Sequence, residues 1–123
     1  MDHIYVFLDD YREAPEGYVL VRTIDECRTL LKEYNIRHLS LDHDLVSKKR
    51  NGLMLVNMMV DEQLYADRIT IHSANASGGK NMYKCLKQAQ LDAKMPHSTE
   101  VFLRPLPLKS YPPHMLQHYS VAK

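Results

Sequence analysis

Short apolar segments alternate with helix-patterned segments along most of the chain, and this alternation constrains the fold most strongly. Five segments have the length and composition of buried strands: residues 4–8, 18–22, 36–41, 68–71 and 100–103. Three others repeat apolar residues at helical spacing: 23–34, 52–64 and 80–92. Strands that alternate with helices predict an α/β domain with a mostly parallel five-stranded sheet and helices on both faces.

Local signals support parts of this assignment. Thr23 and Glu26 have the spacing of a capping box, which predicts the start of a helix. The seven residues between the first two predicted strands are too few for a crossover helix, because such connections usually need a dozen or more. We therefore expect a loop in place of the first helix, or a second strand that pairs differently. The last nineteen residues, 105–123, hold four of the six prolines, and we expect only a short helix there, near residues 114–119.

Length and composition restrict the class of protein. The 123 residues suit one domain, with residues 95–123 forming its fifth strand and a proline-rich tail. A net charge of +1 argues against binding long duplex nucleic acid. The sequence starts almost directly with a strand and has no apolar run of membrane-spanning length, so we expect a cytoplasmic protein without membrane contact. Cys27 and Cys85 have neither metal-site nor disulfide spacing.

Polar and ionisable residues follow four of the predicted strands. The carboxyl ends of parallel strands form the edge of a sheet at which ligands bind. We therefore expect these residues to meet in one crevice: Asp9, Asp10, Asp42, His43, Asp44, His72, Ser73, Asn75 and Arg104.

Two histidines occupy equivalent positions at successive strand ends. His43 and His72 are expected to be neighbours, and two imidazoles facing one crevice suit acid–base chemistry because each exchanges protons near neutral pH. Asp42 and Asp44 flank His43, so that one can orient its ring while the other caps the next turn. Each histidine also has a purely structural interpretation.

The remaining residues suit ligand contacts. Ser73 and Asn75 are small donors for a phosphate or a ribose, and Arg104 can bind a phosphate through two hydrogen bonds or pair with an aspartate. Asp9 and Asp10, with Asp44, can hold a divalent cation, Mg²⁺ or Mn²⁺, and a second possible set of ligands is Asp10, Asp42 and a histidine. Asp9 and Asp10 can equally pair with Arg12 or Arg104 without any metal, or simply cap the loop after the first strand.

A set of motifs resembles one known family. The strings LDDYREAPEG (8–17), VRT (21–23), SLDHDL (40–45), NG (51–52) and IHSAN (71–75) occur in the order found in the cyclic-phosphate-processing receiver-like domains. This family is a divergent branch of the response-regulator receiver fold, which is flavodoxin-like. The resemblance places Asp9 and Asp10, Asp42 or Asp44, Ser73, and Arg104 followed by a proline at the positions of receiver site residues. The two histidines have no counterpart in phosphate-accepting receivers.

The resemblance implies an enzyme that acts on a cyclic phosphate, either a 2′,3′-cyclic RNA end or a cyclic nucleotide. We then expect His43 and His72 to share the acid and base roles, Asp42 to orient His43, and four residues to bind the phosphate: Arg12, Ser73, Asn75 and Arg104. Two alternatives stay open. The chain can bind a cyclic nucleotide without cleaving it, or act as a phospho-acceptor receiver at Asp42 or Asp44.

Overall fold

The computed structural model of the chain describes residues 3–10, 12–45, 51–73 and 75–104. The elements within these residues follow in this order: β1 (His3–Leu8), β2 (Val19–Val21), α1 (Ile24–Glu33), β3 (Asn35–Leu41), α2 (Gly52–Glu62), β4 (Arg68–Ile71), α3 (Ala76–Leu91) and β5 (Glu100–Leu103). The strands form one sheet in the order β2-β1-β3-β4-β5, and each neighbouring pair is parallel. The predicted α/β class and parallel sheet are confirmed.

The first connection has no helix among its described residues. β1 and β2 are parallel neighbours, and the Asp9 amide donates to the Val21 carbonyl at 3.1 Å. The segment between them turns back without a crossover helix, as its length predicts.

The helix starts follow their capping residues. Thr23 and Glu26 form the predicted capping box at α1, with both reciprocal hydrogen bonds present. α3 begins at Ala76, four residues before the start that we expected from the sequence. The Asn75 side chain caps it by accepting from the Gly78 amide at 2.8 Å. Gly78 and Gly79 suggested a loop, but both are buried in the first turns of the helix.

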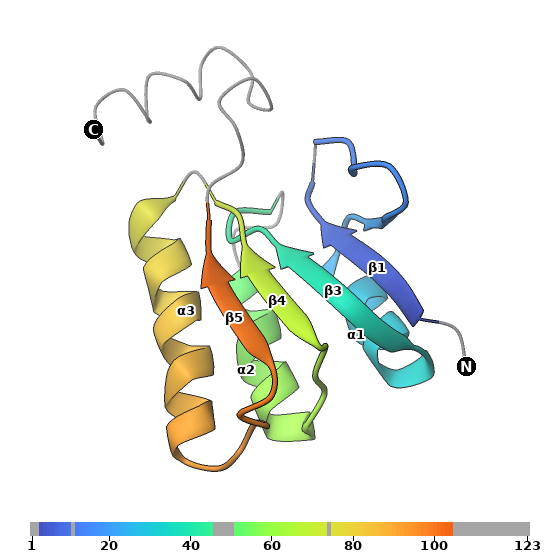
Figure 1. The fold of residues 1–123 in the computed structure, drawn as a ribbon. Helices are drawn as coiled ribbons and strands as arrows, with labels where there is room; N and C mark the ends of the chain where they lie inside the picture. Colours follow the sequence, from blue (N-terminus) through green and yellow to red (C-terminus); the bar gives the residue numbers. More distant parts are fainter. Residues whose placement is uncertain (1–2, 11, 46–50, 74, 105–123) are drawn as a thin grey trace.

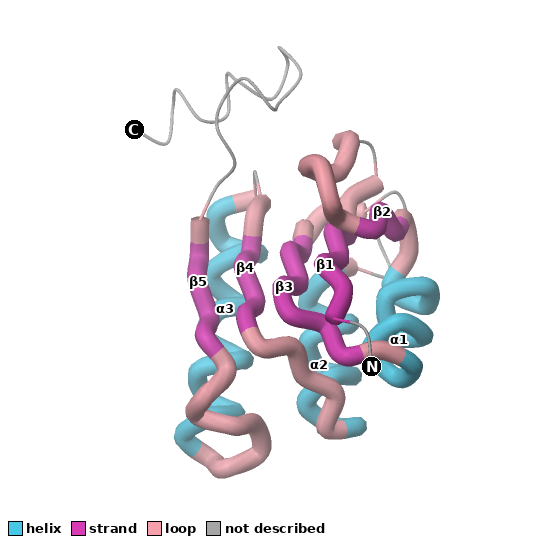
Figure 2. Tube along the Cα trace, turned by 45° about the vertical axis from the view of Figure 1, so that its right-hand side comes forward, coloured by secondary structure: helices cyan, strands magenta, loops and turns pink. Residues whose placement is uncertain are grey.

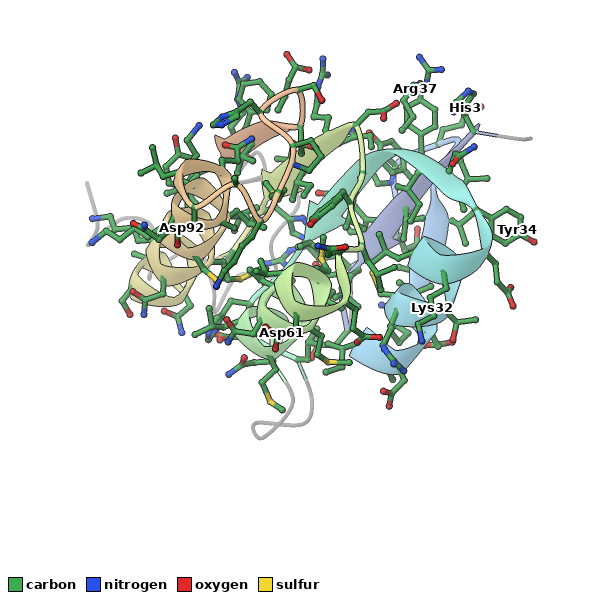
Figure 3. All side chains as sticks on the ribbon, turned by 90° about the horizontal axis from the view of Figure 1, so that it is seen from below. His3, Lys32, Tyr34, Arg37, Asp61 and Asp92 are labelled. Atoms are coloured by element: carbon green, nitrogen blue, oxygen red, sulfur yellow. The ribbon has the colours of Figure 1, made fainter. Side chains whose placement is uncertain are left out.

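The three described helices cover the same face of the sheet. Figure 1 shows α1, α2 and α3 behind the strands, Figure 2 shows α2 and α3 behind them and α1 to the right of β1, and Figure 3 shows the three helices together on one side of the sheet. Within the described residues, helices therefore lie on one face of the sheet, and the predicted helices on the other face are not found there. The predicted tail helix and the rest of residues 105–123 lie outside them. None of the described helices has the length and apolar character needed to cross a membrane.

The face opposite the helices, which we call the open face, carries three rows of side chains across the strands. The pairing of the strands places Tyr5, His38, Arg68 and Glu100 in the first row, and Phe7, Ser40, Thr70 and Phe102 in the second. Because side chains alternate along a strand, the next row begins one residue beyond each strand, at the carboxyl ends. That third row contains the predicted site.

Candidate active site

Four side chains stand in the third row: Asp9, Asp42, His72 and Arg104. Each continues the parallel pairing beyond the end of its strand. The amides of Asp42, His72 and Arg104 donate to carbonyls of the adjacent strands at 3.1, 2.8 and 3.0 Å. The row therefore brings together residues from four strands that lie far apart in the sequence.

A buried arginine joins the two aspartates of this row. The Arg12 amide donates to Asp9 Oδ1 at 2.9 Å, and Arg12 Nη1 donates to Asp9 Oδ2 at 2.6 Å. The same Nη1 atom lies 3.5 Å from Asp42 Oδ2. Arg22 fixes this loop by donating to the carbonyls of Asp9 and Arg12 at 3.2 and 3.0 Å. The guanidinium of Arg12 thus supplies a positive charge between two buried carboxyl groups.

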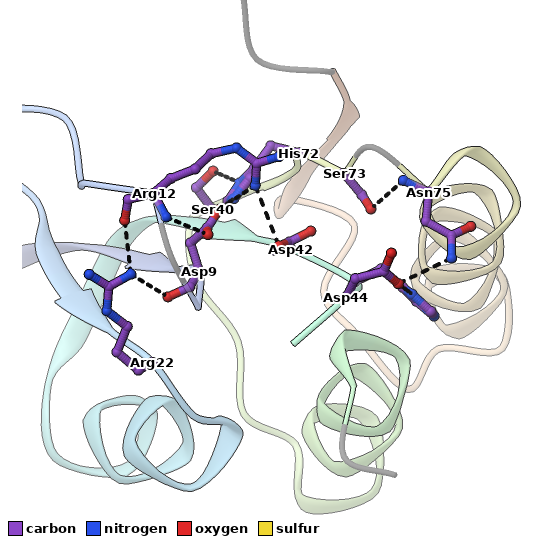
Figure 4. A network of polar contacts seen from close by, with 10 residues as sticks. Asp9, Arg12, Arg22, Ser40, Asp42, Asp44, His72, Ser73 and Asn75 are labelled. Atoms are coloured by element: carbon purple, nitrogen blue, oxygen red, sulfur yellow. Dashed lines mark hydrogen bonds and ion pairs between the residues drawn. The ribbon is translucent and has the colours of Figure 1, made fainter. Parts of the chain in front are cut away.

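His72 is sealed within the same network (Figure 4). Its exposed fraction is 0%, and its ring stacks on Phe7 with centroids 4.4 Å apart and planes 4° from parallel. Nε2 lies 3.1 Å from Asp9 Oδ2 and Nδ1 lies 2.6 Å from Ser40 Oγ. Burial lowers the pKa of His72 in spite of the nearby Asp9 carboxylate. The contacts therefore suit a neutral ring that donates from Nε2 to Asp9 and accepts from the Ser40 hydroxyl at Nδ1.

Asp42 has a carboxyl group whose pKa lies well above its ordinary value. The side chain is buried, and burial is the main cause that raises its pKa to about 8. The negative charge of Asp9 raises this pKa further, while Arg12 lowers it. A carboxyl group in this state can donate a proton near neutrality.

A second polar cluster lies beside the N-terminus of α3. His43 Nδ1 donates to Asp44 Oδ1 at 2.7 Å, because a carboxylate can only accept. Asn75 Nδ2 donates to the same oxygen at 3.1 Å, and the Asn75 amide donates to Ser73 Oγ at 3.0 Å. Figure 4 shows this cluster beside the Asp9–His72 network. Asp44 thus fixes the tautomer of His43, with Nε2 left as the acceptor nitrogen of the neutral ring.

The ring of His43 packs directly on α3. A Cβ atom built on Gly78 would lie 2.6 Å from both His43 Cγ and Nδ1, which only the absence of a side chain permits. Gly52 is equally constrained, because its Cβ would lie 2.2 Å from the Asp42 carbonyl oxygen. Two glycines in the first turns of α2 and α3 therefore leave the space that the backbone and the His43 ring occupy at the end of β3.

The structure corrects three details of the predicted site. His43 and His72 do not face a common crevice, because the first packs on α3 on the helix side and the second is buried on the open face. Asp44, and not Asp42, is the carboxylate that orients His43. Asp42, and not Asp44, joins the acidic pair after β1. All three follow from the alternation of side chains along β3, which sends adjacent residues to opposite faces.

The comparison with protein families identifies the domain. The model of the family "Cyclic-phosphate processing Receiver domain" matches residues 4–88, which is more than half of the chain. The chain belongs to this family. No curated protein and no solved structure matches it.

In this receiver domain the matched region contains both polar clusters but stops before β5. Arg104, which the sequence suggested as a phosphate ligand, lies outside it. Its guanidinium is placed 4.7 Å from the centroid of the Phe102 ring, and it stands at the end of the third row. Ser73 and Asn75 are brought to His43 as expected, whereas Arg12 is held inside the acidic network.

The acidic cluster of the receiver domain has the oxygen donors that a hard divalent cation prefers. One carboxylate oxygen from each of Asp9, Asp10 and Asp42 lies within 4.8 Å of the others, and Asp10 Oδ1 is buried without a hydrogen-bond partner among the residues that the structure describes. Arg12 Nη1, however, already lies among them. The three carboxylates therefore suit a divalent cation by their chemistry, but the Arg12 guanidinium already lies between them. A cation could bind here only by displacing this guanidinium.

Several residues of the receiver site were missed by sequence reasoning. Ser40 and Phe7 bind His72, and Arg22 holds the loop that carries Arg12. A serine inside an apolar strand was the available signal for Ser40. Gly78 carried a signal as well, since a buried glycine in a helix often marks a close approach.

Proposed function

We propose that this receiver domain hydrolyses a cyclic phosphodiester where the end of β3 meets the N-terminus of α3. One observation carries the proposal: an imidazole oriented by a carboxylate packs against the first turn of a long helix. The N-terminus of a helix favours anions through its free amides, and His43 rests on this turn. The family name supplies the cyclic phosphate as the chemical class of the substrate.

The first turn of α3 suits a phosphate in its composition. α3 is 16 residues long and its first turn contains no acidic residue. Ser73 and Asn75 add a hydroxyl and an amide at its start, and both are partly exposed. A phosphate bound here would lie beside the His43 ring.

The imidazole of His43 can carry the proton in both directions. His43 Nε2 accepts a proton from water as the water oxygen forms a bond to phosphorus, while Asp44 holds the opposite nitrogen. The bond from phosphorus to one ribose oxygen breaks, and that oxygen takes the proton that His43 has gained, because Asp42 is buried on the other face of the sheet. The product is a phosphate monoester. His72 has no direct role in this scheme and positions Asp9 instead.

The test is hydrolysis of 2′,3′-cyclic nucleotides and of a short RNA that ends in a cyclic phosphate. We expect His43→Gln to lower kcat by about 100-fold or more, the usual contribution of a proton-transferring group. Asp44→Asn should lower kcat less, because the imidazole remains but loses its orientation. His97→Gln is the matched control, since His97 is exposed and far from these clusters in sequence.

The outcomes separate the candidate functions. If the wild type binds a cyclic nucleotide but forms no product, the chain is a binding module and the hydrolase proposal is wrong. If product forms at the same rate in wild type and His43→Gln, the proton-transfer role of His43 is wrong.

A further inference from the structure

A pocket of about 390 Å³ lies on the open face, at the opposite end of the strands from the candidate active site. The first row of side chains lines it, together with Tyr18, Arg37 and Asp67. Figure 1 shows this face toward the reader, with the helices behind it. The volume falls within the range of small-ligand sites.

A β-bulge places a cation at this pocket. Ile4 pairs with Ile36, whereas Tyr5 pairs with His38, so Arg37 is an extra residue in β3. Bulges often redirect a side chain next to a functional site. Arg37 lines the pocket beside His38 and is exposed, and Figure 3 shows it on the side of the sheet away from the helices.

The pocket also has an exposed aromatic ring on a fixed base. Tyr5 is 40% exposed and meets Tyr18 edge to face, with ring centroids 5.3 Å apart. The Tyr18 hydroxyl hydrogen-bonds His38 Nδ1, and His38 Nε2 lies 2.7 Å from Thr70 Oγ1. Tyr18 and His38 are therefore held in place, while Tyr5 offers a surface on which a planar group can stack.

Two arginines and an aromatic ring lie on the open face between this pocket and the candidate active site. Arg68 and Arg104 both lie over Phe102, at 5.7 and 4.7 Å from its ring centroid. Arg68 Nε is paired with Glu100 at 3.1 Å, but both side chains are about half exposed, and such pairs are weak. Arg68 belongs to the first row and Arg104 to the third, so the path spans four residues, about 13 Å.

We propose that the open face binds the nucleotides that precede a cyclic phosphate at an RNA 3′ end, so that the substrate is an RNA end rather than a free cyclic mononucleotide. This inference rests on the proposed function. Single strands are bound by exposed aromatic rings that stack on bases and by arginines that track phosphates, and both line this path. A mononucleotide seated at the site could not also reach the pocket, whereas a strand of a few nucleotides could.

The test measures, by fluorescence anisotropy, how tightly the protein binds oligoadenylates of one, two and four nucleotides that end in a 3′-hydroxyl. These probes report on the open face without requiring hydrolysis. We expect the dissociation constant to fall at least tenfold from one to four nucleotides. Tyr5→Ala and Arg68→Gln should each weaken tetranucleotide binding at least fivefold.

The helix-covered side of the chain offers matched controls. Tyr34 is 41% exposed at the end of α1, and Arg28 forms an ion pair with Glu62 that is more buried than that of Arg68 with Glu100. Tyr34→Ala and Arg28→Gln should bind the tetranucleotide as the wild type does. Arg68→Gln should also reduce the slope of log affinity against log salt by about 0.7, the effect of one lost phosphate contact on a single strand.

Three results would overturn the inference. In the first, the affinity for oligoadenylates does not depend on their length. In the second, Tyr34→Ala and Arg28→Gln weaken binding as much as Tyr5→Ala and Arg68→Gln. In the third, the wild type binds no RNA and sediments as a dimer that Tyr5→Ala dissociates. The proposed function is tested separately by hydrolysis in the same variants. Hydrolysis with equal kcat/KM for one and four nucleotides refutes only the RNA inference, whereas length-dependent binding without hydrolysis refutes only the enzymatic proposal.

Discussion

The His43 ring occupies the space that a side chain at position 78 would need. Because a Cβ on Gly78 would lie 2.6 Å from the ring, the imidazole reaches the first turn of α3 only while residue 78 is glycine. Gly78 is thus a positioning residue for the proposed proton transfer, although it contributes no functional group of its own.

Gly78→Ala should therefore lower activity without unfolding the domain. The substitution forces the His43 ring away from Asp44 and from the helix terminus, while alanine favours the helix by roughly 0.5–1 kcal/mol. We expect at least a tenfold loss in kcat with little change in the melting temperature. Gly79→Ala is the control, because its Cβ would lie 3.3 Å from the flexible end of Leu103. Equal activities of the two variants would contradict the positioning role.

The sequence predicted the fold because its local signals agree with one another. The apolar strands, the Thr23 capping box and the short first connection all point to the sheet that is observed. The start of α3 was misjudged because Gly78 and Gly79 weaken a helix in isolation. Tertiary contacts with His43 and Leu103 explain why glycines stand there.

The residues of the site were predicted from the sequence, but their division between the two faces of the sheet was misjudged. Strand ends brought Asp9, Asp42 and His72 into one row, as topology requires. The predicted ends of β3 and β4, residues 41 and 71, agree with the structure. His43 is the second residue after β3 and His72 the first after β4, so the alternation of side chains sends them to opposite faces.

His72→Ala should destabilise the domain strongly. The variant removes a fully buried ring, leaves a cavity against Phe7 and deprives Asp9 and Ser40 of partners. Losses of this kind cost about 3 kcal/mol. Chemical denaturation should show this loss, and a loss below about 1 kcal/mol for His43→Ala, whose ring is partly exposed. A His72→Ala protein as stable as the wild type would refute the structural role of His72.

Arg12 should determine whether the acidic cluster binds a metal. Removing one partner of a buried ion pair costs about 3–5 kcal/mol, so Arg12→Ala should be much less stable than the wild type. Mn²⁺ should raise the melting temperature of Arg12→Ala, because the carboxylates of Asp9, Asp10 and Asp42 then lack their cation. The double variant Arg12→Ala/Asp10→Asn should lose this response. A wild type that Mn²⁺ stabilises as strongly as Arg12→Ala would contradict the prediction.

Labelling with a small phosphodonor and Mg²⁺ should leave Asp42 unmodified in the wild type. A phospho-acceptor aspartate must be ionised and must share a cation with the incoming phosphate. Asp42 is buried and protonated near neutral pH, and Arg12 lies at the cation position. Mass spectrometry of the intact protein measures the outcome, with Asp42→Asn as the blank. A phosphoryl group that appears on the wild type and not on Asp42→Asn would show that the domain is a phospho-acceptor.

Asp42 should also make the stability of the domain fall as the pH rises toward 8. Its pKa is about 8 in the folded protein and about 4 in an unfolded chain, so between these values the folded state binds more protons. The contribution of Asp42 is complete below about pH 4 and is lost as the pH rises through about 8. Burial lowers the pKa values of His72 and His38, which act in the opposite direction and reduce stability below about pH 6.5.

The window from about pH 6.5 to 8 therefore isolates the contribution of Asp42 from those of the buried histidines. Across it the free energy of unfolding of the wild type should fall by up to about 1.4 kcal/mol per pH unit. Asp42→Asn keeps the shape of the side chain without its ionisation, so its stability should change little over the same window. Asp61→Asn, at an exposed position on α2, should retain the slope of the wild type. Parallel slopes for Asp42→Asn and the wild type would mean that Asp42 is ionised throughout this range, which would contradict the raised pKa of its carboxyl group.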